Sequence, residues 1–113
     1  MIEIIYETYR EGHVQTVKMS MKGHADYDDS GKDIVCSSVS VLFFNLMDIL
    51  DRMDNFDGAA VSLPGDVELE YQYPADNIQC QTVIDFTLNG LDLVAENYPD
   101  NVQIKNIIES GAR

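Results

Sequence analysis

The change in hydrophobic period between residues 14–22 and residues 34–53 is the feature that most constrains the fold. In the first segment Val17, Met19 and Met21 alternate with polar residues, which predicts a strand with one buried face. In the second segment the apolar residues recur at steps of three and four, which predicts an amphipathic helix about 30 Å long. The expected buried stripe is Val35, Val39, Leu42, Phe43, Leu46, Leu50 and Met53. A strand followed by such a helix predicts an α+β fold.

The rest of the chain predicts the order β-β-α-β-β-α-β in a single domain of 113 residues. The other expected elements are strands at 2–9, 60–63, 67–73 and 102–104, hairpin loops at 10–13 and 64–65, an end to the first helix at 55–58, a second helix from a cap at Asp76 or Asn77 to about residue 98, and a frayed end at 110–113. We therefore expect two layers, a mostly antiparallel sheet packed by two long helices.

Two details concern how the helices pack. Val41, Phe44 and Ile49 widen the apolar stripe of the first helix, which indicates either a central helix or a subunit contact. Gly90 lies inside the second helix, where glycine costs about 1 kcal/mol, so we expect a close packing contact there.

The charge and cysteine content restrict the class of protein. The chain has 20 acidic and 7 basic residues, a net charge of −13, so direct contact with nucleic acid is not expected. The charge either suits a basic partner or only keeps the protein soluble. Cys36 and Cys80 are too few for a disulfide scaffold. We see no secretory signal, and the longest uncharged run, 34–47, is short for a membrane span. These features predict a cytoplasmic protein with free thiols.

Residues 23–40 hold the chemistry. His24 lies where the second strand ends, and the loop that follows carries four aspartates. The last of them, Asp33, has the side chain of a helix N-cap, which puts Cys36 at the third helical position. A sulfur there lies near unpaired backbone N–H groups and the positive end of the helix dipole, which favours the thiolate. The loop can bring His24 to Cys36, as a nucleophilic Cys/His pair requires.

Other interpretations of these residues are also open. A lone cysteine is more often a small buried residue than a nucleophile, and a lone histidine is usually structural. Two metal ligands are a further alternative, but structural zinc sites use closely spaced Cys and His pairs, which are missing, so we expect no metal and no cofactor. His13 lies in a different turn, and we expect Cys80 to pack in the second helix.

The residues around the pair resemble the Prp family, small bacterial ribosomal-processing cysteine proteases also called YsxB-like proteins. The matching positions are Gly23, His24, Ala25, Gly31, Asp33, Ile34, Val35, Cys36 and Ser40. The resemblance covers the whole chain in length and in order of elements. Family members carry small residues such as alanine or glycine after the cysteine, and here Ser37 and Ser38 take those places.

The resemblance implies an endopeptidase that removes the N-terminal extension of large-subunit ribosomal protein twenty-seven, and a homodimer. Cys36 would be the nucleophile and His24 the general base, with backbone N–H groups at the helix start as oxyanion donors. Asp33 is the expected helix cap and a candidate to orient His24. Ser40 bonds either into the site or to the carbonyl of Cys36. The loop 25–32, bounded by glycines Gly23 and Gly31, is a candidate lid.

Two competing hypotheses belong to other classes. An acidic binding module would hold a basic ribosomal protein without cutting it, and would not need Cys36. A redox sensor would use Cys36 as a reactive thiol resolved by Cys80.

Overall fold

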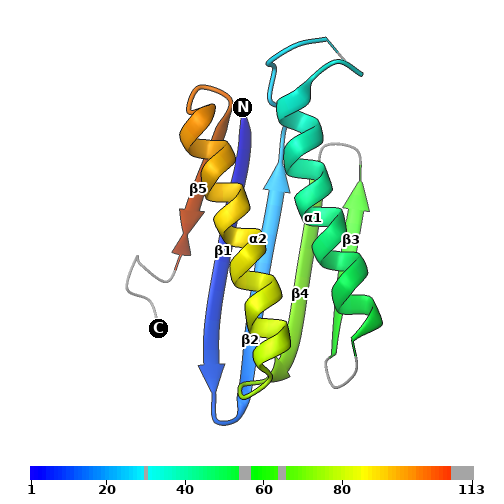
Figure 1. Cartoon of the computed structure of the whole chain (residues 1–113), viewed down its shortest axis with the longest axis vertical. Helices are drawn as coiled ribbons and strands as arrows, with labels where there is room; N and C mark the ends of the chain where they lie inside the picture. Colours follow the sequence, from blue (N-terminus) through cyan, green and yellow to red (C-terminus); the bar gives the residue numbers. More distant parts are fainter. Residues whose placement is uncertain (30, 54–56, 64–65, 108–113) are drawn as a thin grey trace.

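The chain folds into two layers, a five-stranded sheet with two helices on one of its faces (Figure 1). The computed structural model describes residues 1–29, 31–53, 57–63 and 66–107. Its elements are β1 (Ile2–Glu11), β2 (Val14–Lys22), α1 (Ile34–Arg52), β3 (Asp57–Leu63), β4 (Asp66–Pro74), α2 (Ile78–Asn97) and β5 (Val102–Asn106). The strand order is β3-β4-β2-β1-β5, antiparallel except for the β1–β5 pair. The predicted fold class and order of elements are confirmed.

Strand pairing extends several elements beyond their predicted ends. The β1–β2 ladder continues to the pair Glu11 and Val14, so the turn is Gly12 and His13 alone, with Gly12 at φ +60°. β5 runs two residues further than predicted because its parallel pairing with β1 continues to Asn106. The prediction that residues 55–58 only end the helix is wrong at its far end, since Gly58 pairs with Tyr71 inside the sheet. Residues 55 and 56, the turn at 64–65 and the end at 110–113 lie outside the described residues.

The core lies between the sheet and the helices. The sheet contributes buried residues from two strands, Val17, Met19 and Met21 of β2 and Val67, Leu69, Tyr71 and Tyr73 of β4. The buried residues of α1 are Val35, Val39, Phe43, Leu46 and Leu50. Leu42 and Met53 pack against this core while half-buried. By length and composition alone α1 is apolar enough to cross a membrane, but here its apolar stripe packs on the sheet. The predicted buried faces are confirmed.

The helices contact each other at Gly90, as its position predicted. A Cβ at Gly90 would lie 3.1 Å from Cδ2 of Leu42, so glycine allows α1 and α2 to approach closely. On their outer sides the helices expose apolar residues, since Val41 is 65% and Phe44 45% exposed. The first helix is therefore not a central helix, and the alternative of a subunit contact stays open.

Two buried tyrosines of β4 point their hydroxyls at the helices. The Tyr71 hydroxyl donates to Oδ1 of Asp51 at 3.0 Å, and the Tyr73 hydroxyl donates to Oε1 of Gln81 at 2.9 Å. Burial, and then the Asp51 carboxylate, raise the pKa of Tyr71 to about 12. Burial, with the nearby Cys80 and Asp85, raises the pKa of Tyr73 to about 12.

We predict that these two tyrosines make the protein sensitive to alkali. The pKa of tyrosine is about 10 in an unfolded chain, so between pH 10 and 12 the folded chain holds protons that the unfolded chain releases. The stability that the tyrosines contribute is complete below pH 10 and is lost as the pH rises to 12. Thermal melts followed by circular dichroism should show a steeper fall in this window for the wild type than for Tyr71→Phe.

Tyr71→Phe also removes the hydrogen bond to Asp51, so it should cost about 1 kcal/mol at pH 8. Tyr27→Phe is the control, because that ring is 47% exposed. Equal slopes for the wild type and Tyr71→Phe between pH 10 and 12 would show that the hydroxyl is not linked to folding.

Candidate active site

A hollow of about 420 Å³ lies at the loop that joins β2 to α1. Figure 1 shows this loop at the top of the molecule. Its lining is His24, Asp26, Asp28, Gly31, Asp33, Cys36 and Ser37. The histidine and the cysteine that the sequence singled out therefore face one cavity. It is accessible to solvent, since His24 is exposed and Cys36 is half-buried.

The Asp33 carboxylate joins the loop to the start of α1. Its Oδ1 accepts the N–H groups of Val35 at 3.0 Å and Cys36 at 2.9 Å, which confirms the predicted cap. Its Oδ2 accepts the N–H groups of Tyr27 at 2.9 Å and Asp28 at 3.3 Å. Burial works against the charge, but the four donated bonds outweigh it and hold the pKa of Asp33 below its ordinary range.

These bonds change two of the expected roles. A carboxylate has about four acceptor positions, and backbone N–H groups fill them here, so Asp33 has none left for the imidazole of His24. Three N–H groups of the helix start also have acceptors, because Val35 and Cys36 donate to Oδ1 and Ser37 donates to the carbonyl of Asp33 at 3.1 Å. An oxyanion could use these three groups only by taking them from their acceptors, which weighs against the expectation that they are its donors.

Cys36 occupies the third helical position, as predicted, and its sulfur faces the loop. The backbone N–H of Ala25 donates to Sγ, with the nitrogen 3.3 Å from the sulfur. Ala25 directly follows His24 and is 1% exposed. The loop that carries the candidate base therefore also contacts the candidate nucleophile through its backbone.

The remaining residues of the motif have different surroundings. Gly23 has φ +94°, and a Cβ there would lie 2.5 Å from the carbonyl oxygen of Met1, so only glycine fits. Gly31 has φ +84° and borders the hollow with open space around it. Ser40 is half-buried one turn below Cys36 and is not among the residues that line the hollow.

Two contacts of the loop with the α2–β5 turn were not predicted. Nδ2 of Asn101 donates to the carbonyl of Ala25 at 2.9 Å. The rings of Tyr27 and Tyr98 meet edge to face, with centroids 5.3 Å apart. Each partner follows the loop residue that it contacts by more than 70 positions, so no local sequence pattern predicts these contacts.

The second cysteine lies at the other end of the helical layer. Cys80 is fully buried, burial raises its pKa, and its sulfur lies 3.5 Å from Sδ of Met53. Met53 follows Cys36 by 17 residues, about 25 Å along a helix, whereas the Cα atoms of a disulfide lie within about 7 Å. The packing role of Cys80 is confirmed, and this fold excludes a Cys36–Cys80 disulfide.

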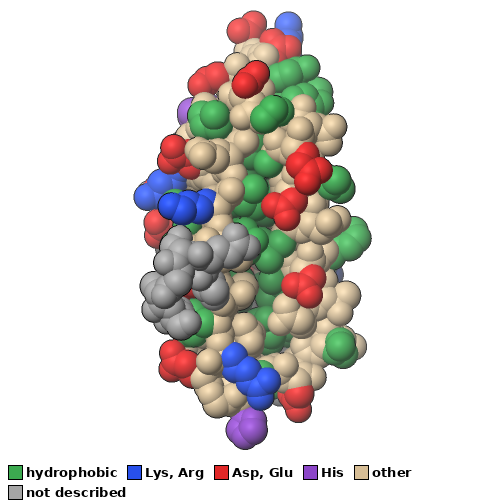
Figure 2. All heavy atoms as spheres, turned by 90° about the vertical axis from the view of Figure 1, so that its left-hand side faces the viewer, with side chains coloured by type: hydrophobic (Ala, Val, Ile, Leu, Met, Phe, Trp, Pro, Cys, Tyr) green, Lys and Arg blue, Asp and Glu red, His purple; other side chains and the backbone are tan. Residues whose placement is uncertain are grey.

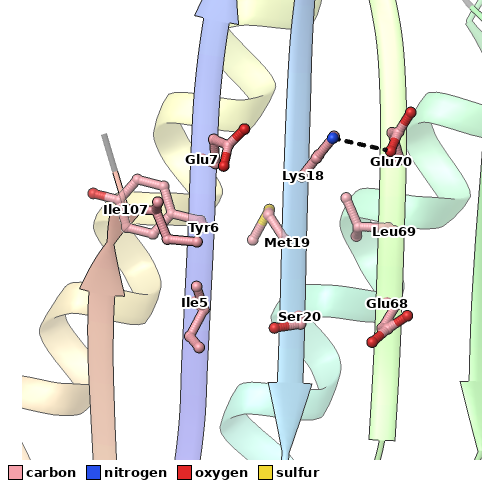
Figure 3. Close-up of a pocket in the computed structure, with 10 residues that line it drawn as sticks. All are labelled: Ile5, Tyr6, Glu7, Lys18, Met19, Ser20, Glu68, Leu69, Glu70 and Ile107. Carbon is pink, nitrogen blue, oxygen red and sulfur yellow. Dashed lines mark ion pairs between the residues drawn. The ribbon is translucent and has the colours of Figure 1, made fainter. Parts of the chain in front are cut away.

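Two other features of the described residues bear on this chemistry, namely how the possible metal ligands are grouped and a second hollow. Among the described residues no three His, Cys, Asp or Glu side chains group as metal ligands would. A hollow of about 370 Å³ lies on β1, β2 and β4 (Figure 3). Its polar lining includes Lys18 paired with Glu70 at 3.7 Å, but it contains no cysteine or histidine.

Comparisons with known proteins identify related structures and a family. The chain is similar to a structure described as an essential ribosomal processing protease Prp from S. aureus with a covalently linked product peptide, at 23% identity and a TM-score of 0.79 over 94% of this chain and 99% of that one. SMU.848 from Streptococcus mutans is 26% identical, with a TM-score of 0.62, over 94% of this chain and 93% of that one. A search of curated proteins gave no match. The model of the family described as cysteine protease Prp matches residues 1–103, so this chain belongs to the cysteine protease Prp family.

Proposed function

We propose that this protease removes the N-terminal extension of large-subunit ribosomal protein twenty-seven, with Cys36 as nucleophile and His24 as general base. The observation that carries the proposal is the shared hollow, in which the residue after His24 donates its N–H to Sγ of Cys36. The protease relative from S. aureus is described as a ribosomal processing enzyme, which supports the substrate class.

The chemistry follows from the two side chains. His24 takes the thiol proton, and Sγ of Cys36 attacks the carbonyl carbon of the scissile peptide bond. The C–N bond then breaks, and the imidazolium returns its proton to the leaving amine. Water hydrolyses the resulting thioester, again with His24 as the base, and frees the enzyme.

The surface charge supports a basic substrate. Acidic side chains are spread over the side of the molecule shown in Figure 2, in keeping with the net charge of −13. Such a surface attracts a cationic ribosomal protein and raises its association rate at low salt. We place the reaction in the cytoplasm, which suits a protein whose two cysteines are both free.

We predict a defined cut in the extended ribosomal protein. Under reducing conditions the wild type should release one new N-terminus, identified by mass spectrometry. Cys36→Ala should abolish the cut, and His24→Ala should lower kcat by about 10²- to 10⁴-fold, the range for a general base. The same ribosomal protein without its extension should stay intact.

His13→Ala is the matched histidine control, because His13 is exposed in the β1–β2 turn, at the other end of β2 from His24. It should cleave like the wild type. No cut by the wild type, with tight binding retained by Cys36→Ala, would instead favour an acidic binding module.

We predict that Asp33 acts by holding the loop against the helix. Asp33→Asn keeps an oxygen for the helix cap but turns the acceptor of the Tyr27 and Asp28 N–H groups into a donor. Asp33→Ala removes both functions. Because small misplacements of reacting groups are costly, kcat/KM should fall about tenfold to a hundredfold in both variants. Thermal melts should show a larger loss of stability for Asp33→Ala.

The pH dependence tests the same point. The folded pKa of Asp33 lies below its ordinary value of 3.8, so its contribution to stability is present above 3.8 and is lost as the pH falls through the folded pKa. The difference in melting temperature between the wild type and Asp33→Asn should therefore shrink below pH 3.8.

Asp48→Asn is the control for activity. Asp48 is a carboxylate of α1 that pairs with Arg52 on the surface, so its substitution should not reduce activity.

We also propose that the chain is a homodimer whose subunits meet through the outer sides of the helices. Phe86 of α2 is 76% exposed and Leu93 is 50% exposed, and Val41 and Phe44 of α1 are exposed as well. Light scattering on the purified protein should give twice the mass of one chain, and Phe86→Ser should shift the population toward the monomer. The mass of one chain for the wild type at high concentration would contradict the dimer.

A further inference from the structure

We propose that the backbone N–H of Ala25 is the oxyanion donor of this protease, and that Asn101 is the positioning residue that directs it. The inference rests on the proposed function, because it assigns a role within acyl transfer to Cys36. It places part of the active site in the α2–β5 turn, outside the motif that carries the cysteine and the histidine.

Three N–H groups at the helix start already have acceptors. In many thiol enzymes the N–H groups at the start of the nucleophile's helix stabilise the oxyanion. Here the N–H groups of Val35 and Cys36 donate to the Asp33 carboxylate at 3.0 and 2.9 Å. The Ser37 N–H donates within the helix to the carbonyl of Asp33 at 3.1 Å. Using any of these groups would break a bond that holds the cap.

The Ala25 N–H already donates to the reacting atom, with its nitrogen 3.3 Å from Sγ of Cys36. When the thiolate attacks, a C–S bond forms and the carbonyl π pair moves to the oxygen, so negative charge passes from sulfur to an oxygen on the adjacent carbon. The Ala25 N–H can then donate to this oxygen instead of Sγ after a small shift in position. When the oxygen lone pair re-forms the carbonyl, the C–N bond breaks and His24 protonates the leaving amine.

Asn101 holds Ala25 in this position. Its Nδ2 donates to the carbonyl of Ala25 at 2.9 Å, so Ala25 is bonded on both sides and is 1% exposed. Asn101 is itself fixed through its backbone, since its N–H donates to the carbonyl of Tyr98 at 3.0 Å and its carbonyl accepts the N–H of Ile2 at 2.8 Å. Substitution of the side chain leaves these two backbone bonds in place.

Two reagents that attack the same thiolate separate this role from a structural one. p-Nitrophenyl acetate acylates Cys36 through an oxyanion, whereas iodoacetamide alkylates it by displacement without one. In Asn101→Ala the rate constant for acylation should fall about tenfold, because the donor is loosened but not removed. The rate constant for alkylation, measured where the thiolate is fully formed, should change less than twofold. With the ribosomal substrate, kcat should fall while KM stays within twofold.

Asn97→Ala is the matched control, because the Asn97 side-chain amide also donates to a backbone carbonyl, that of Leu93 at 2.7 Å, but on the exposed surface of α2. It should react like the wild type with both reagents. Equal acylation rates in Asn101→Ala and Asn97→Ala would overturn the proposal. A parallel fall in acylation and alkylation would also overturn it, because Asn101 would then act on the thiol alone.

A measurement on the unmodified chain covers the case in which Asn101→Ala does not fold. Acetyl-phenylalaninal forms a tetrahedral adduct with a thiol, and in that adduct the amide proton of Ala25 should move downfield and exchange more slowly with water. An unchanged Ala25 resonance in a confirmed Cys36 adduct rules the donor out. These readouts need no ribosomal substrate, so they stand even when the wild type fails to cleave it.

Discussion

The carboxylate of Asp33 is the interaction on which the site depends. It receives four backbone N–H groups, two from the start of α1 and two from the loop that begins after β2. A loop with four aspartates in a chain of net charge −13 would otherwise repel itself and leave the site. Because one buried anion binds both segments, the positions of His24 and Cys36 are set together rather than separately.

This arrangement uses backbone N–H groups that could otherwise stabilise an oxyanion. The N–H groups of Val35 and Cys36 donate to the Asp33 carboxylate, so an oxyanion could use them only by breaking the cap. The N–H of Ala25 lies at the sulfur itself and can serve as the donor without breaking the cap. The cap and the donor are thus linked, since a helix start that binds its own carboxylate needs a second segment to stabilise the reaction.

The sequence predicted the elements and the local parts of the site, because both depend on short-range patterns. The period change across residues 23–33 located β2 and α1, and the cap at Asp33 set the helical position of Cys36. Predictions failed where distant residues decide. The start of β3 depends on its pairing with β4, and the bond from Asn101 to Ala25 spans 76 residues. Asp33 also accepts hydrogen bonds from the backbone N–H groups of Tyr27 and Asp28. The sequence does not predict these bonds, because every residue type except proline has a backbone N–H group.

The sheet topology explains why the end of the chain reaches the site at all. β5 pairs in parallel with β1, starting with Ile2 beside Val102. The turn before β5 therefore lies at the same end of the sheet as the last residues of β2. The bond from the Ile2 N–H to the Asn101 carbonyl fixes that turn, and Tyr98 meets Tyr27 from it. The parallel strand therefore does more than widen the sheet. It brings a rigid support to a loop whose residues are mostly small or acidic and in which Tyr27 is the large apolar side chain.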